Sequence, residues 1–242
     1  MKSFNPAHLA QAIVHWLEYQ SICDRAALFS EAYLSQPLGE YSLSLGPQRF
    51  EPEFEYPAAY QGAARRKKAM DFAILGRNVA NTQNVVKHAI ETKFATAKRS
   101  FYQEVYDDLF RLLWFQPTRE QAGCKRWLVI AGYQKNIHGE KLLGAKVQLK
   151  RGRNQPQVLA FRGLLSTDLN NASRTKPVHG ANPQLRRLWG EAANAFEQTE
   201  LPDSITVRLA GRYPRKSRPA DLCCYVWEVL RPQPDFPNTY PI

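Results

Sequence analysis

A glutamate and a lysine stand two residues apart in the apolar segment VVKHAIETKFA, Val85–Ala95. Side chains alternate between the two sides of a strand, so Glu91 and Lys93 are predicted to point the same way. Their neighbours on that side are the small Ala89 and Ala95. The opposite side carries Val86, His88, Ile90, Thr92 and Phe94. Beside small residues, such a carboxylate can hold a cation while the ammonium offsets negative charge that develops on a substrate.

The preceding apolar segment, AMDFAIL (Ala69–Leu75), supplies a second carboxylate, that of Asp71. The alternation places Asp71 with Ala69, Ala73 and Leu75 and leaves Met70, Phe72 and Ile74 on the other side. Two carboxylates that approach each other repel, and each pKa rises unless a cation lies between them. Mg²⁺ takes oxygen ligands and keeps several waters, so it fits this pair better than zinc, and Mn²⁺ is expected to substitute for it. Lys93 is then placed to position an attacking water and to offset charge in a transition state.

A simpler interpretation stays open, because an acid-x-lysine triplet alone carries little information. Glu91 and Lys93 could form an ordinary ion pair on an exposed sheet face, with Asp71 merely solvated; same-face pairs of this kind are common and weak. The interpretation as a catalytic site therefore depends on the elements around the triplet.

Those elements predict an α/β fold with a mixed sheet. A helical pattern runs from Pro6 to about Gln36 with a break near 21–24, where Asp24 is expected to cap a second helix that ends at Pro37 and Gly39. FEPEFEY (50–56) alternates like an edge strand, and WLVIAGY (127–133) suits a buried strand. Between them, 100–115 is strongly amphipathic. Its polar positions are Glu104, Asp107, Asp108 and Arg111, of which Asp107, Asp108 and Arg111 are expected to form helix-face pairs. Past 135 the pattern predicts strands at 156–165, 205–210 and 223–230 and a helix at 182–196.

This order of elements, with Asp71, Glu91 and Lys93 on consecutive strands, resembles the PD-(D/E)xK nuclease superfamily over roughly 7–133. The resemblance implies a restriction-endonuclease-like mixed central sheet flanked by helices, here with a C-terminal α+β elaboration. It also implies that Asp71, Glu91 and the backbone carbonyl of Thr92 bind magnesium, and that Lys93 is the catalytic lysine. A first-helix glutamate is sometimes added in the superfamily, for which Glu31 is favoured over Glu18. Met70 replaces the proline that leads the motif, as in many members.

Charge predicts the partner. The 242-residue chain has a net charge of +11, and residues 135–242 hold 17 Lys and Arg against 9 Asp and Glu. Such basic clusters suit a polyanion, although each could also be a solvated loop. The residues expected to bind nucleic acid are Lys150, Arg151, Arg153, Arg212, Arg215, Lys216 and Arg218; a third cluster, RRKK, precedes Asp71.

Residues 1–134 are interpreted as the nuclease-like core and 135–242 as a basic elaboration packed on the same domain. The four cysteines show no zinc or disulfide pattern, and His88 is expected to be a core histidine rather than a base. No apolar run approaches the length of a membrane span and no signal-peptide zones are visible, so a cytoplasmic protein without a membrane partner is expected.

Three functions follow from these observations. The first is a magnesium-dependent nuclease, an enzyme that hydrolyses phosphodiester bonds, most simply in DNA, as a homodimer or within a defence or repair complex. The second is a catalytically inactive nucleic-acid-binding protein on the same fold. The third is an assembly component whose charge serves solubility alone.

Overall fold

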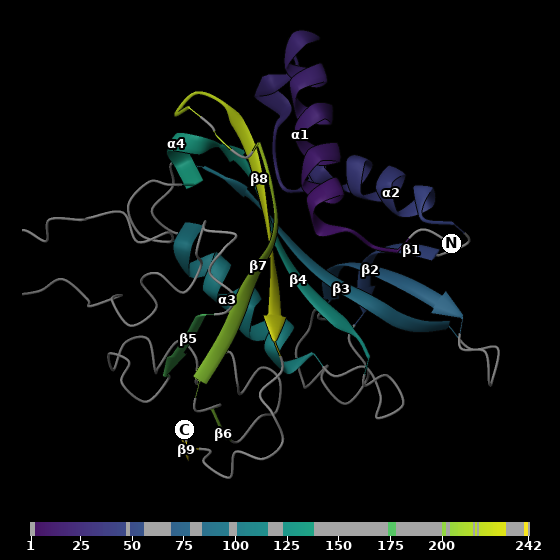
Figure 1. Ribbon diagram of the computed structural model, residues 1–242, viewed down its shortest axis with the longest axis vertical. Helices are drawn as coiled ribbons and strands as arrows, with labels where there is room; N and C mark the ends of the chain where they lie inside the picture. Colours follow the sequence, from purple (N-terminus) through teal and green to yellow (C-terminus); the bar gives the residue numbers. More distant parts are fainter. Residues whose placement is uncertain are drawn as a thin grey trace, which may run out of the picture.

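The computed structural model describes residues 3–46, 49–55, 69–77, 84–96, 101–115, 123–137, 174–177, 200–201, 204–214, 216, 218–230 and 240–241 (Figure 1). The helices are α1 (Pro6–Ile22), the short 3-10 turns η1 (Ala26–Leu28) and η2 (Ala32–Leu34), α2 (Ser35–Ser44), α3 (Phe101–Trp114) and α4 (Gln134–Ile137). The strands are β1 (Arg49–Glu55), β2 (Ala69–Arg77), β3 (Asn84–Ala95), β4 (Lys125–Tyr133), β5 (Arg174–Pro177), β6 (Glu200–Leu201), β7 (Ser204–Tyr213), β8 (Leu222–Leu230) and β9 (Tyr240–Pro241).

Seven of the described strands form one sheet in the order β1-β2-β3-β4-β8-β7-β5, and β6 pairs with β9 separately. β3 and β4 run parallel, joined through α3, while the other pairs in the sheet are antiparallel. The prediction of an α/β fold with a mixed sheet is therefore confirmed. β8 pairs with β4 along seven residue pairs, so strands from both sides of Gln134 share this sheet.

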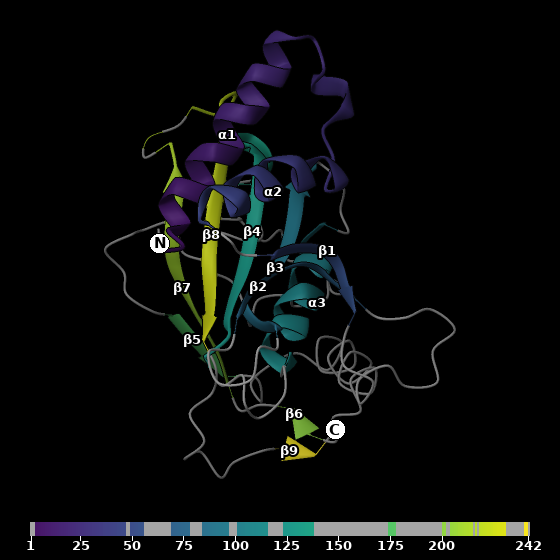
Figure 2. The same ribbon diagram turned by 90° about the vertical axis from the view of Figure 1, so that its right-hand side faces the viewer.

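Helices cover the two faces of the sheet (Figures 1 and 2). α1 packs on β7 and β8 and α2 on β1, and their apolar side chains join one buried cluster with Ile90, Phe94 and Val129. α3 packs on the opposite face against β3, β4 and β8, in a second cluster that contains Ala89, Leu128 and Tyr225. We call these the α1 face and the α3 face.

The N-terminal helices differ from their prediction. Asn5 caps α1 by accepting from the amides of Ala7 and His8 at 3.0 and 3.2 Å, and α1 ends at Ile22. Asp24 does not cap a helix, because its φ of +59° is left-handed. Pro37 does not end one either: it lies in the first turn of α2, where a missing N–H costs no helical hydrogen bond.

The sheet is irregular where β1, β2 and β3 meet. Glu53 of β1 has a φ of +49° and lies between the residues that pair with Phe72 and Met70 of β2. Beyond this irregularity the side chain of Met70 lies on the α3 face, although the alternation predicted it beside Phe72 on the α1 face. Further along, Ile74 pairs with His88 but Leu75 pairs with Val86. The extra residue is a β-bulge that moves Val86 to the α3 face, against prediction.

Of the elements predicted past residue 135, two are present and two cannot be compared with the structure. The strands expected near 205–210 and 223–230 are present as β7 and β8. The strand expected at 156–165 and the helix expected at 182–196 lie outside the described residues. Within the part of the chain that the structure describes, no helix is both long and apolar enough to cross a membrane.

Candidate active site

The backbone pairing of β2 and β3 stops at Asp71, where the Asp71 side chain accepts the hydrogen bonds instead. The paired register begins at Phe72 with Ile90 and continues away from Asp71. At the opening, Oδ2 of Asp71 accepts the backbone N–H of Thr92 at 2.7 Å and its hydroxyl at 3.0 Å. The carboxylate therefore lies in the gap between the strands, rather than projecting from the regular face that alternation predicted.

Thr92 presents its backbone to the same gap. The N–H and C=O of one strand residue point toward the same neighbouring strand. Because the N–H of Thr92 points at Asp71, its carbonyl is directed into the opening as well. This placement suits the role of oxygen ligand that the family resemblance implies for Thr92.

Glu91 lies next to this opening and is fully buried. Its Oε2 is 3.4 Å from the backbone nitrogen of Asp71, and its Oε1 is 3.8 Å from Nη1 of Arg111. Burial raises the pKa of Glu91 well above its usual value, the charges of Asp108 and Asp71 raise it further, and Arg111 offsets part of the rise. Glu91 thus belongs to a crowded set of carboxyl groups that favours a proton or a cation.

Lys93 is held between two carboxylates. Its Nζ lies 2.9 Å from both oxygens of Glu31 and 2.9 Å from Oδ2 of Asp108. Burial lowers the pKa of Lys93, but the two carboxylates outweigh burial and raise the pKa above its ordinary value. Lys93 is therefore an ammonium that donates hydrogen bonds at neutral pH, not a base.

Glu31, which directly precedes η2, reaches the site from 62 residues away in sequence. Its side chain is 40% exposed, and burial is the main cause of its raised pKa. Its charge also interacts with that of Asp71, but its hydrogen bonds go to Lys93. Glu18, the other candidate, is an exposed residue of α1.

Two residues of α3, Asp108 and Arg111, belong to this site although their spacing predicted only a pair within the helix. The predicted helix-face pair between Asp108 and Arg111 is present at 3.2 Å, but Asp108 is fully buried and also pairs with Lys93 of β3. A signal was present in the sequence. Asp108 falls three residues after Val105 and four before Leu112, so it interrupts the apolar stripe of α3.

The basic residues predicted to bind nucleic acid are only partly described. Lys150, Arg151, Arg153, Arg215 and the RRKK cluster lie outside the described residues. Arg212 is half-buried near the end of β7, and Lys216 and Arg218 are exposed in the connection to β8. The register joins Lys93 to Ile130, Tyr225 and Arg212 in one row. At the usual strand spacing, Arg212 is about 14 Å from Lys93 on the α3 face.

His88 is neutral and packed, as expected. Trp127 donates its indole N–H to Nδ1 of His88 at 3.0 Å, and Phe4 stacks on the ring at 4.3 Å. Burial, with the charges of Lys125 and Lys87, lowers the pKa of His88 to about 4. Nothing in this arrangement points to a general base.

The donor set fits a divalent cation bound by few protein ligands. Four carboxyl groups, those of Glu31, Asp71, Glu91 and Asp108, surround the two cations Lys93 and Arg111. Within the described ranges, no three His, Cys, Asp or Glu side chains form a cluster suited to a metal. A cation at Asp71 and Glu91 would thus rest on two carboxylates, a backbone oxygen and water, which is the usual mode for Mg²⁺ and not for structural zinc.

Comparisons with protein-family models, with curated proteins and with solved structures find no match.

Proposed function

We propose that this protein is a magnesium-dependent nuclease of the PD-(D/E)xK type that hydrolyses phosphodiester bonds in DNA. One observation carries the proposal: two carboxylates from adjoining strands, Asp71 and Glu91, meet where the strands separate, and the ammonium of Lys93 lies on the same strand as Glu91. An ordinary surface pair would be exposed, whereas Glu91 and Lys93 are buried. Perturbed titratable groups brought together in this way are typical of functional sites.

The residues have separate roles in this proposal. Asp71, Glu91 and the carbonyl of Thr92 would hold Mg²⁺, which when bound polarises a phosphoryl oxygen and lowers the pKa of a water ligand. Thr92 orients Asp71 through two hydrogen bonds, so one ligand is already aligned. Lys93, being protonated, would donate to a phosphate oxygen as its negative charge grows in the transition state.

A second function is favoured by one specific feature. Side chains of the site already pair with one another: Thr92 donates to Asp71, Lys93 donates to Glu31, and Asp108 forms an ion pair with Lys93. Such an internally paired network is also what a non-catalytic nucleic-acid-binding or assembly protein on this fold would retain.

Cleavage assays separate these functions. Purified protein would be incubated with supercoiled plasmid and with single-stranded oligonucleotides, in Mg²⁺ and in chelator. Wild type should cut only with Mg²⁺, and Lys93→Met should lower the rate by on the order of a hundredfold while DNA affinity stays within a few fold. Lys87→Met is the matched control, because Lys87 is an exposed lysine of the same strand and should cut like wild type.

Each other outcome has a distinct meaning. Equal cutting by wild type and Lys93→Met would place the active site elsewhere. Salt-dependent DNA binding without cleavage would support the binding protein, and neither cleavage nor binding would support an assembly role.

A further inference from the structure

One buried carboxylate joins the two cations of the candidate site. Oδ2 of Asp108 lies 2.9 Å from Nζ of Lys93, and its Oδ1 lies 3.2 Å from Nη1 of Arg111. Lys93 comes from β3, while Asp108 and Arg111 are one helical turn apart on α3. The bridge therefore ties a helix to the strand that bears Glu91.

Stability alone does not account for this arrangement. Asp108 occupies a position of the α3 stripe that an apolar side chain would fill, between Val105 and Leu112. Replacing a buried ion pair by packed apolar groups is often neutral or stabilising, because desolvation offsets much of the attraction. A buried acid that holds two cations beside a pair of carboxylates points instead to a functional demand on those cations.

The two cations differ in access. The side chain of Lys93 is 9% exposed, whereas that of Arg111 is 38% exposed and opens to solvent. Nη1 of Arg111 lies 3.8 Å from Oε1 of Glu91, so the guanidinium stands beside this carboxylate. A guanidinium has five donors in a planar fork that matches phosphate oxygens.

We propose that α3 supplies a second phosphate-binding cation, Arg111. Asp108 is a positioning residue that fixes Arg111 and Lys93 relative to each other. This proposal rests on the nuclease function above. Arg111 contacts a backbone phosphate of the DNA strand next to Glu91, while Lys93 faces the phosphate that is cleaved. Asp108 contacts no substrate and acts through the two cations.

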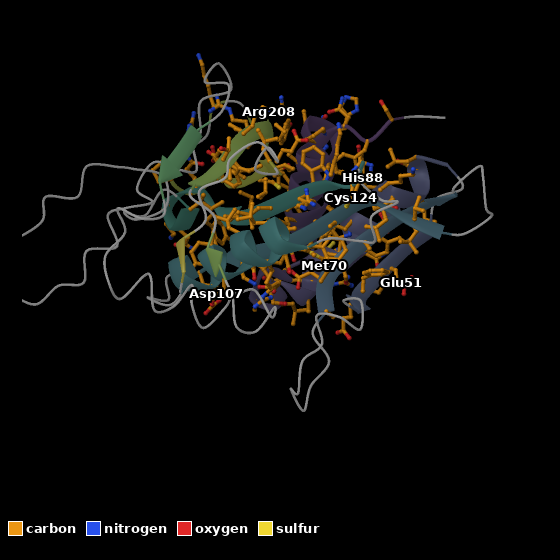
Figure 3. The ribbon with its side chains drawn as sticks, turned by 90° about the horizontal axis from the view of Figure 1, so that it is seen from below. Glu51, Met70, His88, Asp107, Cys124 and Arg208 are labelled. Carbon is orange, nitrogen blue, oxygen red and sulfur yellow. The ribbon has the colours of Figure 1, made fainter. Side chains whose placement is uncertain are left out.

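Variants of α3 test the proposal. Arg111→Gln should lower kcat/KM on plasmid DNA by about 10- to 100-fold, and Arg111→Lys should recover part of the loss because the charge remains. Asp108→Asn should lower kcat by about tenfold or more, because the amide cannot accept from both cations. Asp107→Asn is the matched control: it removes one acid from the same helix, at a side chain that Figure 3 shows on the outer side of α3, and should stay within twofold of wild type.

Salt dependence distinguishes a phosphate contact from a structural role. Binding of a fluorescent DNA duplex would be measured in Ca²⁺, which occupies oxygen sites, over a range of NaCl concentrations. Loss of one phosphate contact should make the slope of log Kd against log salt shallower by about one for Arg111→Gln and leave it unchanged for Asp107→Asn.

Thermal unfolding tests the bridge without any activity. If Asp108 holds Lys93, the loss of Tm in Asp108→Asn/Lys93→Met should be smaller than the sum of the two single losses. Additive losses would overturn the positioning role.

The remaining outcomes are separable. If wild type cuts DNA and Arg111→Gln matches Asp107→Asn in kcat/KM and in salt slope, Arg111 is not a phosphate contact and only this proposal fails. If wild type neither cuts nor binds DNA, the proposed function and this proposal fail together. If Asp108→Asn does not fold, the two Arg111 variants still show whether Arg111 contacts a phosphate.

Discussion

The two faces of the sheet are built from the same strands and differ in chemistry. On β3, Ile90 and Phe94 enter the apolar cluster under α1, while the alternating Glu91 and Lys93 are buried under α3. Among the described residues, the buried charged side chains on the α3 face are Glu91, Lys93, Asp108 and Arg126. The register of β4 and β8 places Glu228 on the α1 face, where it pairs with Arg208, far from Asp107 of α3 (Figure 3).

The two faces of the sheet therefore contribute differently to stability and to the candidate site. Both faces gain free energy from apolar burial, which is roughly proportional to the area removed from water. The α3 face keeps small residues, Ala89 and Ala95, around charges whose desolvation opposes folding. The apolar groups of both faces should therefore supply stability, and the buried charges of the α3 face should serve function.

The largest expected contrast is between Ile13→Ala on the α1 face and Glu91→Gln on the α3 face. Ile13 is fully buried, and its truncation should lower the free energy of unfolding by about 2–5 kcal/mol. Glu91→Gln removes a carboxylate that burial and two other acids disfavour, so stability should stay the same or rise while cleavage is lost. Urea denaturation and plasmid cleavage would measure both effects. Equal destabilisation by the two changes would contradict this division.

The second contrast is the dependence of the free energy of unfolding on pH, measured in chelator so that no divalent cation is bound. Burial raises the pKa of Asp108 to about 7 despite its pairing with Lys93 and Arg111, and the pKa of Glu91 is also raised. The folded protein then binds more protons than the unfolded chain above about pH 4, so the free energy of unfolding should fall as pH rises from 5 toward 8. Thermal melts should show a smaller fall for Asp108→Asn than for wild type. An unchanged fall would mean that Asp108 does not titrate in this range.

The third contrast is the effect of divalent cations. If Asp71 and Glu91 share a cation, millimolar Mg²⁺ or Mn²⁺ should raise the Tm of wild type by a few degrees but not that of Asp71→Ala. Ile13→Ala should keep the full shift, because it leaves the α3 face intact. An identical shift in wild type and Asp71→Ala would remove the shared site.

The smallest effect concerns the exposed residues between β7 and β8. If Lys216 and Arg218 contact phosphates, Lys216→Gln/Arg218→Gln should make the log-log salt slope of DNA binding shallower by about two. Lys87→Gln, at the far end of β3, is the control for loss of an exposed charge. A salt slope equal to that of this control would mean that Lys216 and Arg218 belong to a solvated turn and do not contact phosphates.

Local periodicity by itself determined most of the elements. The alternation of 85–95 and the helical pattern of 100–115 predicted β3 and α3 closely, and the identity of side chains two apart placed Glu91 and Lys93 together. These features depend on backbone geometry over a few contiguous residues, which sequence displays directly. The bulge that moved Val86 left no such trace, because it depends on pairing with another strand.

The tertiary structure decided which distant groups join the site. Glu31 meets Lys93 across 62 residues, and α3 turns Asp108 inward to the same ammonium. Gly39 lies inside α2 because packing on β1 outweighs its weak helix propensity. Proximity between elements depends on how they pack and cross, and the sequence of any one element does not contain that information. The sequence therefore placed Glu91 and Lys93 together and made Asp71 and Glu31 candidates beside them, and the fold determined that Asp108 and Arg111 join the same site.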